Sequence, residues 1–354
     1  MSNLRTELKA ELEAAGLLGY EPARVYRKFA VLLSVTVALF AAFLVCPYWV
    51  LKVPLFISAV AANIAVVMLG HESGHGAVSR TPWVNDLLGY LTFPLMTGLS
   101  MAYWKYKHNT LHHSYPNVAQ KDPDINPPFF ALHKEQRATK PGMSWWVQQH
   151  QGLLFWPLTL LTGVGMRRNS FLFHLTYGRR LVSWQNRRVD LAMMLLHYVL
   201  WLIVPVLFFG VSVLNVLLFY SAWTALVGLL LAAIFAPAHM TQPMFRGYDE
   251  NFVLQLQTTQ NLNTNRLFSY LLIGLDRQVE HHLFHRMSHL NIRAAQPIVR
   301  AFCARHGLPY QEQGWGAALW AVTRRLDSLP DYELLDRPPA LAKSRWDTAA
   351  SGSV

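Results

Sequence analysis

The stretch Val53-Pro-Leu-Phe-Ile-Ser-Ala-Val-Ala-Ala-Asn-Ile-Ala-Val-Val-Met-Leu-Gly70 contains no charged residue and leads directly into His71-Glu-Ser-Gly-His75. About 20 apolar residues suffice for a helix to cross the hydrocarbon core of a bilayer. Two histidines four residues apart share one helix face, where they can bind one metal ion. The stretch therefore predicts a membrane-spanning helix that continues past the bilayer and carries metal ligands. A polar helix end whose side chains reach water is the alternative.

Two other runs have the same character. Phe29–Cys46 has no charged residue, and no Asp, Glu, Lys or Arg occurs from 191 to 245, where Gly210-Val-Ser divides the run into two crossings. Only 14% of the chain is charged, against about 25% in soluble domains. The sequence therefore predicts an all-α integral membrane protein with four transmembrane helices in two hairpins. The predicted spans are about 29–46, 53–70, 191–210 and 213–236.

Two further apolar segments, Pro82–Trp104 and Trp145–Met166, carry polar residues and are predicted to be interfacial helices. A crossing by the first alone would place neighbouring histidine clusters on opposite sides of the membrane. The predicted divisions of the chain are a cytoplasmic N-terminal helix at 1–28, a membrane domain at 29–310, and a cytoplasmic C-terminal segment at 311–354. The N-terminal helix is expected to extend through Leu18, and a disordered tail is expected from about Asp336.

The distribution of basic residues predicts the orientation. Of the 31 Lys and Arg residues, Lys52 is the single one between the first two spans, and none lies between the last two. All others are on the side that carries the histidine clusters, which places both termini and all the clusters in the cytoplasm. This topology, rather than nucleic-acid binding, accounts for the net charge of +11. The basic face would attract anionic membrane lipid or an acidic electron-donor protein.

A second cluster, His108-Asn-Thr-Leu-His112-His113, is richer in histidine. Adjacent rings on an α-helix point about 100° apart. One of His112 and His113 can therefore share the face of His108, while the other serves a second metal or a different side. A solvated basic stretch with Lys105 and Lys107 is the alternative.

The third cluster is Gln278-Val-Glu-His281-His282. Gln278 offers a carbonyl oxygen, which could bind a metal directly, bind through water, or only orient a ring. His285 and His289 continue the same helical face. We interpret these two as surface residues, with a supporting role behind the ligands as the alternative.

One more histidine, His239, ends the fourth span at the depth of the first cluster, where it is either a ligand or structural. His197 lies within the third span and is interpreted as a hydrogen-bonded packing residue. No role is assigned to His133, His150, His174 and His306. Eight histidines and a glutamine exceed the four ligands of one closed zinc site, which favours two metal ions. Nitrogen ligation suits iron and zinc equally.

The three clusters resemble the histidine boxes of the integral-membrane fatty-acid desaturases, over roughly residues 25–310. Ser114-Tyr-Pro-Asn-Val-Ala-Gln-Lys-Asp-Pro-Asp124 and Gln278-Val-Glu-His-His-Leu-Phe284 extend the resemblance. It implies a cytoplasmic non-haem centre of two iron ions, with O2 as co-substrate. It also implies desaturation of a fatty-acyl chain linked to lipid, CoA or a carrier protein. The implied iron ligands are His71, His75, His108, His112, His113, His239, His281 and His282.

Gln278 takes the place of the first histidine of the third box. This is similar to the front-end branch of the family, which desaturates between an existing double bond and the carboxyl end. No His-Pro-Gly-Gly haem motif of a fused cytochrome b5 occurs, so we expect a separate electron donor, a ferredoxin or cytochrome b5. His285 stands where the family usually has proline. A hydroxylase, ketolase or acetylenase on the same scaffold is the alternative. A zinc transporter is disfavoured because the predicted spans contain no carboxylate.

Overall fold

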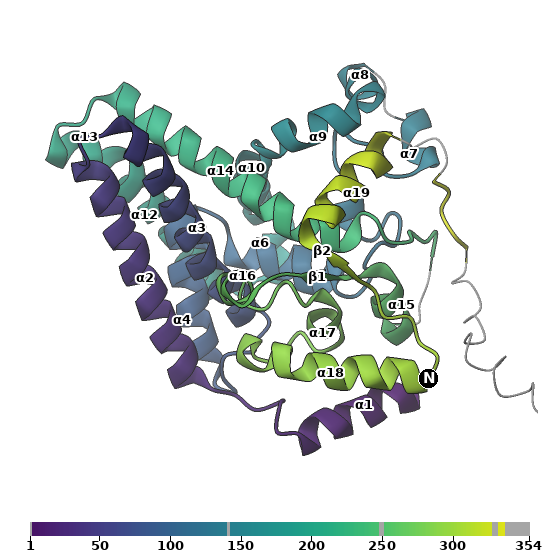
Figure 1. Ribbon diagram of the computed structural model, residues 1–354. Helices are drawn as coiled ribbons and strands as arrows, with labels where there is room; N and C mark the ends of the chain where they lie inside the picture. The colour runs from purple at the N-terminus through teal and green to yellow at the C-terminus, as the bar shows by residue number, and fades with distance from the viewer. Residues whose placement is uncertain (1, 140–141, 248–250, 328–331, 337–354) are drawn as a thin grey trace, which may run out of the picture.

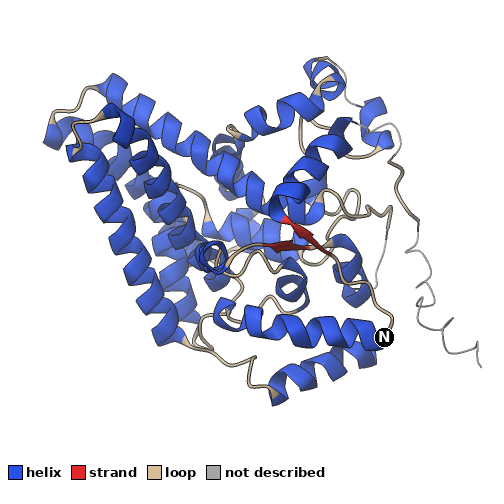
Figure 2. Ribbon diagram, viewed as in Figure 1, coloured by secondary structure: helices blue, strands red, loops and turns tan. Residues whose placement is uncertain are grey.

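The fold is that of a computed structural model, which describes residues 2–139, 142–247, 251–327 and 332–336. The tail predicted after Asp336 lies outside the described residues. The described chain consists mainly of helices joined by loops, with one two-stranded parallel sheet (Figure 2), in which β1 (Asn261–Asn263) pairs with β2 (Glu312–Gly314). The predicted all-α membrane fold is therefore confirmed.

Four helical stretches among the described residues are long and apolar enough to cross a membrane, as predicted. They are α2 (Pro22–Val45), α3 (Trp49–Gly74), the continuous run Trp184–Phe209 formed by α12, η3 and α13, and α14 (Val213–His239). Figure 1 shows α2 beside α3, with α14 leading from α13 towards α19. Each helix extends beyond its predicted apolar run at the end near the histidines. Two carboxylates, Glu72 and Asp190, lie in these extensions, whereas the predicted spans themselves contain no carboxylate.

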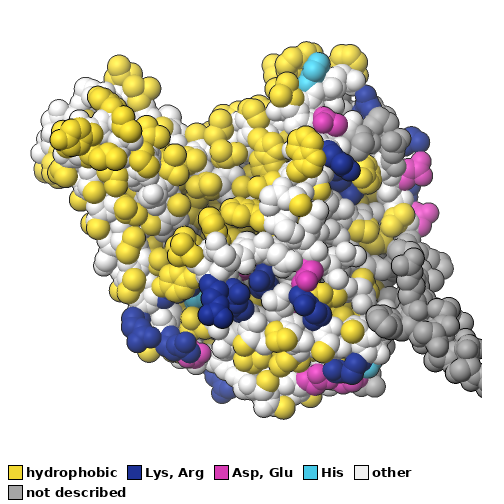
Figure 3. All heavy atoms as spheres, in the orientation of Figure 1, with side chains coloured by type: hydrophobic (Ala, Val, Ile, Leu, Met, Phe, Trp, Pro, Cys, Tyr) yellow, Lys and Arg dark blue, Asp and Glu magenta, His cyan; other side chains and the backbone are white. Residues whose placement is uncertain are grey.

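The surface of these helices is apolar. In Figure 3 hydrophobic side chains cover α13, the start of α14 and the end of α2 that adjoins α13, whereas Lys and Arg side chains gather lower in the view, at the N-terminal end of α2 and beyond it. Val45 and Val50, near the α2–α3 turn, are 81% and 84% exposed. Such exposure of large apolar residues is unfavourable in water and expected in lipid.

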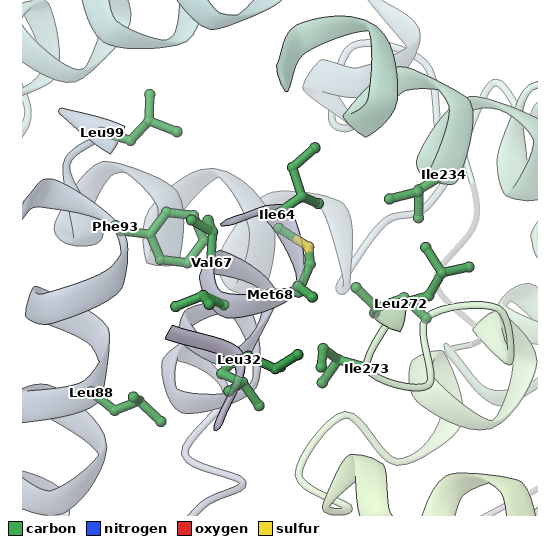
Figure 4. Packing of buried hydrophobic residues seen from close by; sticks show 14 of the residues in the cluster. Leu32, Ile64, Val67, Met68, Leu88, Phe93, Leu99, Ile234, Leu272 and Ile273 are labelled. Carbon is green, nitrogen blue, oxygen red and sulfur yellow. The ribbon is translucent and has the colours of Figure 1, made fainter. Parts of the chain in front are cut away.

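Inside, α3 packs against α2 and against α4 (Pro82–Thr92). Figure 4 shows Val67 and Met68 of α3 in the centre of this core, with Leu88 of α4 on one side and Ile234 of α14 and Ile273, in the loop after α16, on the other. The close approach of α4 needs a glycine, because a Cβ on Gly70 would lie 2.0 Å from Oγ1 of Thr92. This packing fixes the position of α3 at Gly70, immediately before the first histidine cluster.

Both segments predicted to be interfacial are broken into short helices. The first forms α4, α5 (Pro94–Thr97) and α6 (Met101–Trp104), and the second forms α8 (Met143–Gln149), α9 (Gln151–Thr159) and α10 (Thr162–Leu175). None of these described helices is long enough to cross a bilayer. Trp145 and Trp146 of α8 are exposed, as is typical of the aromatic side chains found at membrane–water interfaces.

The start of α6 is tied to the third span. Ser100 caps α6, and Asp190 of α12 accepts hydrogen bonds from the backbone N–H groups of Met101 and Ala102 at 3.0 Å. His174 Nε2 lies 3.1 Å from the same carboxylate, so His174 is not isolated. His197 packs in the third span between the Leu95 carbonyl and the Tyr220 hydroxyl, in agreement with its interpretation.

The remaining elements include η1 and α17, which carry the second and third histidine clusters. They are α1 (Ser2–Ala14), the π-helix η1 (Lys105–His112), η2 (Pro123–Ile125), α7 (Lys134–Thr139), α11 (Gly178–Leu181), α15 (Asn251–Thr258), α16 (Arg266–Leu271), α17 (Gln278–Leu283), α18 (His289–Arg305) and α19 (Trp315–Asp327). Helix α1 packs against α18 through Leu8 and Leu12. It ends before the predicted Leu18, because Gly16 adopts a φ of +70°. The predicted domain divisions at 28 and 310 stay predictions.

Candidate metal centre

Four separate elements bring the eight predicted histidine ligands together. Helix α3 carries His71 and ends at His75, η1 carries His108 and His112 and is followed by His113, α14 ends at His239, and α17 carries His281 and His282. All eight side chains are buried. Burial excludes the alternatives of a solvated helix end and a solvated basic stretch.

The first group consists of His71, His75, His108 and His281, whose closest ring nitrogens all lie within 4.8 Å of one another. Nε2 of His108 lies 2.9 Å from Nε2 of His71 and 3.1 Å from Nε2 of His113. Three Nε2 atoms thus point at one small volume. A shared proton can join one such pair of nitrogens, whereas a metal ion can accept several lone pairs at once.

The second group consists of His112, His239 and His282, also within 4.8 Å. In each ring Nδ1 faces an oxygen acceptor. His112 faces a carboxylate oxygen of Asp122 at 3.1 Å, His239 the carbonyl of Thr258 at 3.1 Å, and His282 the side-chain oxygen of Gln255 at 2.8 Å. An imidazole that donates through Nδ1–H keeps its lone pair on Nε2, so these contacts set the tautomer that suits a metal ligand.

Several of these nitrogens have no hydrogen-bond partner among the described residues. They are both ring nitrogens of His75, Nδ1 of His113, and the Nε2 atoms of His239, His281 and His282. Leaving a buried polar group unsatisfied costs about 1–3 kcal/mol. Metal ligation would satisfy these atoms together, and neutral imidazole suits iron and other first-row metals. The residues present therefore fit a metal centre with two groups of ligands.

The second histidine cluster lies on a π-helix, where the sequence analysis used α-helical spacing. The N–H of His113 bonds to the carbonyl of His108 at 2.9 Å, five residues back. The wider turn places His113 next to His108 and directs His112 to the other group. His113 also stacks on His282 with 4.3 Å between ring centroids, and so lies between the two groups. Of the two adjacent histidines, His113 is therefore the one beside His108, and His112 lies with His239 and His282.

An aromatic residue closes one side of the first group. The ring of Trp104 lies 5.0 Å from that of His71 and 4.6 Å from that of His108. This contact requires the glycine of His-Glu-Ser-Gly-His, because a Cβ on Gly74 would come within 2.2 Å of the indole. Trp104 thus packs on ligand candidates and excludes water from them.

The interpretation of His289 as a surface residue is wrong. It is buried, and its Nδ1 and backbone N–H both bond to the carboxylate of Glu72, which also accepts a hydrogen bond from Ser288 at 2.8 Å. His285 is half-buried, with its ring 5.2 Å from those of His75 and His113. Both residues thus lie against the cluster, and Glu72 joins the start of α18 to the end of α3.

Gln278 is buried at the start of α17, and its side-chain amide donates to the carbonyl of Leu275 at 3.0 Å. Among the described residues, no hydrogen bond joins the side chain of Gln278 to a histidine side chain. Its role as a ligand stays a prediction, as does ligation by each of the eight histidines.

Burial and then repulsion between neighbouring imidazoles hold the pKa of most of these histidines far below the ordinary value of 6.5. This applies to His75, His108, His113, His281 and His282. His112 differs: burial opposes its charge, but the carboxylate of Asp122 outweighs burial and raises its pKa. The depressed pKa values keep five rings neutral near pH 7, which is the form that binds metal.

Metal-free protein is expected to lose stability as the pH falls below about 6.5. The unfolded chain then binds protons that the five buried rings cannot, so the free energy of unfolding decreases with decreasing pH. The measurement is the unfolding temperature of chelator-treated protein in detergent between pH 8 and pH 5.5. An unfolding temperature that stays constant across this range would contradict the expectation.

Residues 47–314 match the model of the family described as fatty acid desaturase. The chain belongs to the fatty acid desaturase family. The resemblance seen in the three histidine boxes is therefore confirmed, and the match includes all three boxes and His239.

Relatives of this desaturase-family chain carry desaturase names. The acyl-lipid (9-3)-desaturase of Physcomitrium patens is 28% identical over 88% of the chain and 60% of its own length. A Delta(5) fatty acid desaturase of Caenorhabditis elegans is 28% identical over 89% of the chain and 71% of its own length. The sn-1 linoleoyl-lipid 6-desaturase of Arthrospira platensis is 25% identical over 87% of the chain and 86% of its own length. The chain thus spans less than two thirds of the length of the Physcomitrium relative.

Sequence reasoning on this family member missed the residues behind the ligands. Asp122 lies in the segment that carried the resemblance, and a carboxylate ten residues after His112 was a usable signal. Gln255 and Thr258 of α15 lie in no motif, and only the fold brings them to His282 and His239.

Proposed function

We propose that this protein is an O2-dependent fatty-acyl desaturase with two iron ions, one for each group of histidines. The observation that carries the proposal is the pair of buried groups, in which ring nitrogens converge while Nδ1 atoms are held by oxygen acceptors. His71, His75, His108 and His281 would bind one iron, and His112, His239 and His282 the other. His113, between the groups, would complete the set of ligands. Gln278 would bind iron or orient a ligand ring at the edge of the centre.

Bound iron would supply the activation of O2 that hydrogen abstraction from a saturated chain requires, since such C–H bonds have no acidic proton. The chain's own residues would hold the ligands and keep water out. Asp122, Thr258 and Gln255 fix three rings through Nδ1, and Trp104 covers one side. The substrate chain must be held with two adjacent carbons beside the metal centre. This step requires accurate positioning of the chain and no acid–base residue.

The substrate would be a fatty-acyl chain linked to a membrane lipid, with CoA and carrier-protein esters as other carriers. Lipid linkage is supported by the names of the Physcomitrium and Arthrospira relatives, an acyl-lipid and a linoleoyl-lipid desaturase. Gln278 supports a front-end position of the new double bond. The one-sided distribution of Lys and Arg supports a cytoplasmic metal centre, with electrons from a separate ferredoxin or cytochrome b5.

Expression of the full chain in a host that lacks endogenous desaturases tests this function. We expect new unsaturated fatty acids by mass spectrometry in aerated cells, none in anaerobic cells, and iron in the purified protein. Hydroxylated or triple-bonded products without an alkene would replace desaturation by hydroxylation or acetylenation on the same scaffold. Zinc without iron, and no O2 consumption with reductant, would reject the proposal.

A further inference from the structure

Helix α14 contains a proline two residues before His239, and this leaves one backbone carbonyl without its usual donor. Pro237 has no N–H, so it cannot bond to the carbonyl of Ala233 four residues back. The indole Nε1–H of Trp315 donates to that carbonyl at 2.8 Å. A side chain from the start of α19 thus replaces the helix hydrogen bond that the proline removes.

Other carbonyls near the end of α14 are satisfied by Gln260. Its side-chain amide donates to the carbonyl of Pro237 at 2.6 Å, and its backbone N–H donates to that of Ala238 at 3.0 Å. Gln260 directly precedes β1 and Trp315 directly follows β2. In the parallel pairing the two donors lie at opposite ends of this short sheet (Figure 1), so that Gln260 meets the last carbonyls of α14 and Trp315 meets the Ala233 carbonyl one turn further back.

This arrangement decides where His239 points. The residue ends α14, its Nδ1 faces the carbonyl of Thr258, and its Nε2 is buried beside His112 and His282. A free carbonyl next to a proline in the last turn would permit that helix end to shift, because its hydrogen bond is missing. A metal ligand tolerates little displacement, and loss of a residue that orients a ligand typically lowers metal affinity about 10- to 100-fold.

We propose that Trp315 is a positioning residue of the metal centre, which fixes the end of α14 so that His239 completes the second group of ligands. This inference rests on the proposed function and extends it beyond the family match, which ends at residue 314. Pro237 and Trp315 act as a pair: the proline removes a helix hydrogen bond, and the indole N–H supplies another to the same carbonyl.

The hydrogen bond can be separated from the packing of the ring. Trp315 also packs edge-on against Phe268 of α16, with 5.5 Å between ring centroids. Trp315→Phe keeps an aromatic ring against Phe268 and removes only the donor and part of the ring area. Trp320→Phe is the matched control, because Trp320 lies on the same helix and is 62% exposed.

The first measurement is the iron content of purified full-length protein. We expect about half of the wild-type iron in Trp315→Phe, as in His239→Ala, and wild-type iron in Trp320→Phe. In a Pro237→Ala background the restored N–H supplies the missing hydrogen bond, so Trp315→Phe should cost little further iron. Equal iron in Trp315→Phe and Trp320→Phe would overturn the inference. An equal loss of iron from Trp315→Phe with and without Pro237→Ala would overturn it too.

The second measurement is the unfolding temperature of metal-free protein, which does not depend on the identity of the metal. Trp315→Phe should lower it more in the wild-type background than in the Pro237→Ala background. If Trp315→Phe alone does not fold, a folded double variant supports the inference and an unfolded one overturns it. Wild-type protein without iron would contradict the proposed function, whereas the difference between backgrounds would still decide the role of Trp315.

Discussion

His108→Ala is expected to abolish desaturation and to remove iron from the purified protein. Nε2 of His108 lies close to Nε2 of both His71 and His113. Removal of the His108 ring therefore changes the surroundings of both of these candidate ligands. Changes behind a ligand already lower metal affinity about 10- to 100-fold, and we expect loss of a ligand to exceed about 100-fold. The measurements are product per mole of protein, by mass spectrometry, and iron per chain.

His150→Ala provides the matched histidine control. His150 is exposed, and its Nδ1 faces the carbonyl of Trp146 within α8. We expect wild-type iron and wild-type product from it. Full activity in His108→Ala, with normal iron content, would remove the assignment of the first group.

Asp122→Asn is expected to lower iron affinity about 10- to 100-fold while the protein remains folded. The carboxylate of Asp122 is fully buried, faces Nδ1 of His112, and raises the pKa of that ring against the effect of burial. An amide of the same shape still fits but carries no charge. The His112 ring then becomes a weaker base and a weaker ligand. Competition with a chelator of known affinity measures the change.

Asp124→Asn is the control for this change. The Asp124 carboxylate is 38% exposed, lies 3.5 Å from Nδ1 of His112, and pairs with Lys107. Solvent-exposed pairs contribute little, so iron affinity should change much less than in Asp122→Asn. Equal losses in the two variants would show that negative charge near His112 matters, and not the hydrogen bond between its Nδ1 and Asp122.

The membrane fold and the candidate ligands could be predicted from local sequence. A bilayer requires about 20 apolar residues for each helical crossing, and this requirement is visible in any single stretch of chain. The charge distribution and three short histidine motifs needed no knowledge of distant contacts. Helix ends were less predictable. The chain continues as helix through Gly74 and His239, because backbone hydrogen bonding does not stop where hydrophobicity does.

The role of each histidine depended on the backbone in ways that spacing alone did not reveal. The extra residue in the turn of η1 places His113 beside His108 and sends His112 to the second group. The surface interpretation of His289 failed for a related reason. Its partner, Glu72, is more than two hundred residues away in sequence.

The sequence by itself determined the class of protein, the number of spans, the family and the set of candidate ligands. These follow from properties that a short segment carries alone, namely apolar length, charge and residue type. The tertiary structure decided how the ligands divide into two groups, which oxygen atoms hold their rings, and how Trp315 satisfies the carbonyl that Pro237 leaves free. Such contacts join segments far apart in the chain, and local periodicity does not predict which distant donor bonds to which acceptor.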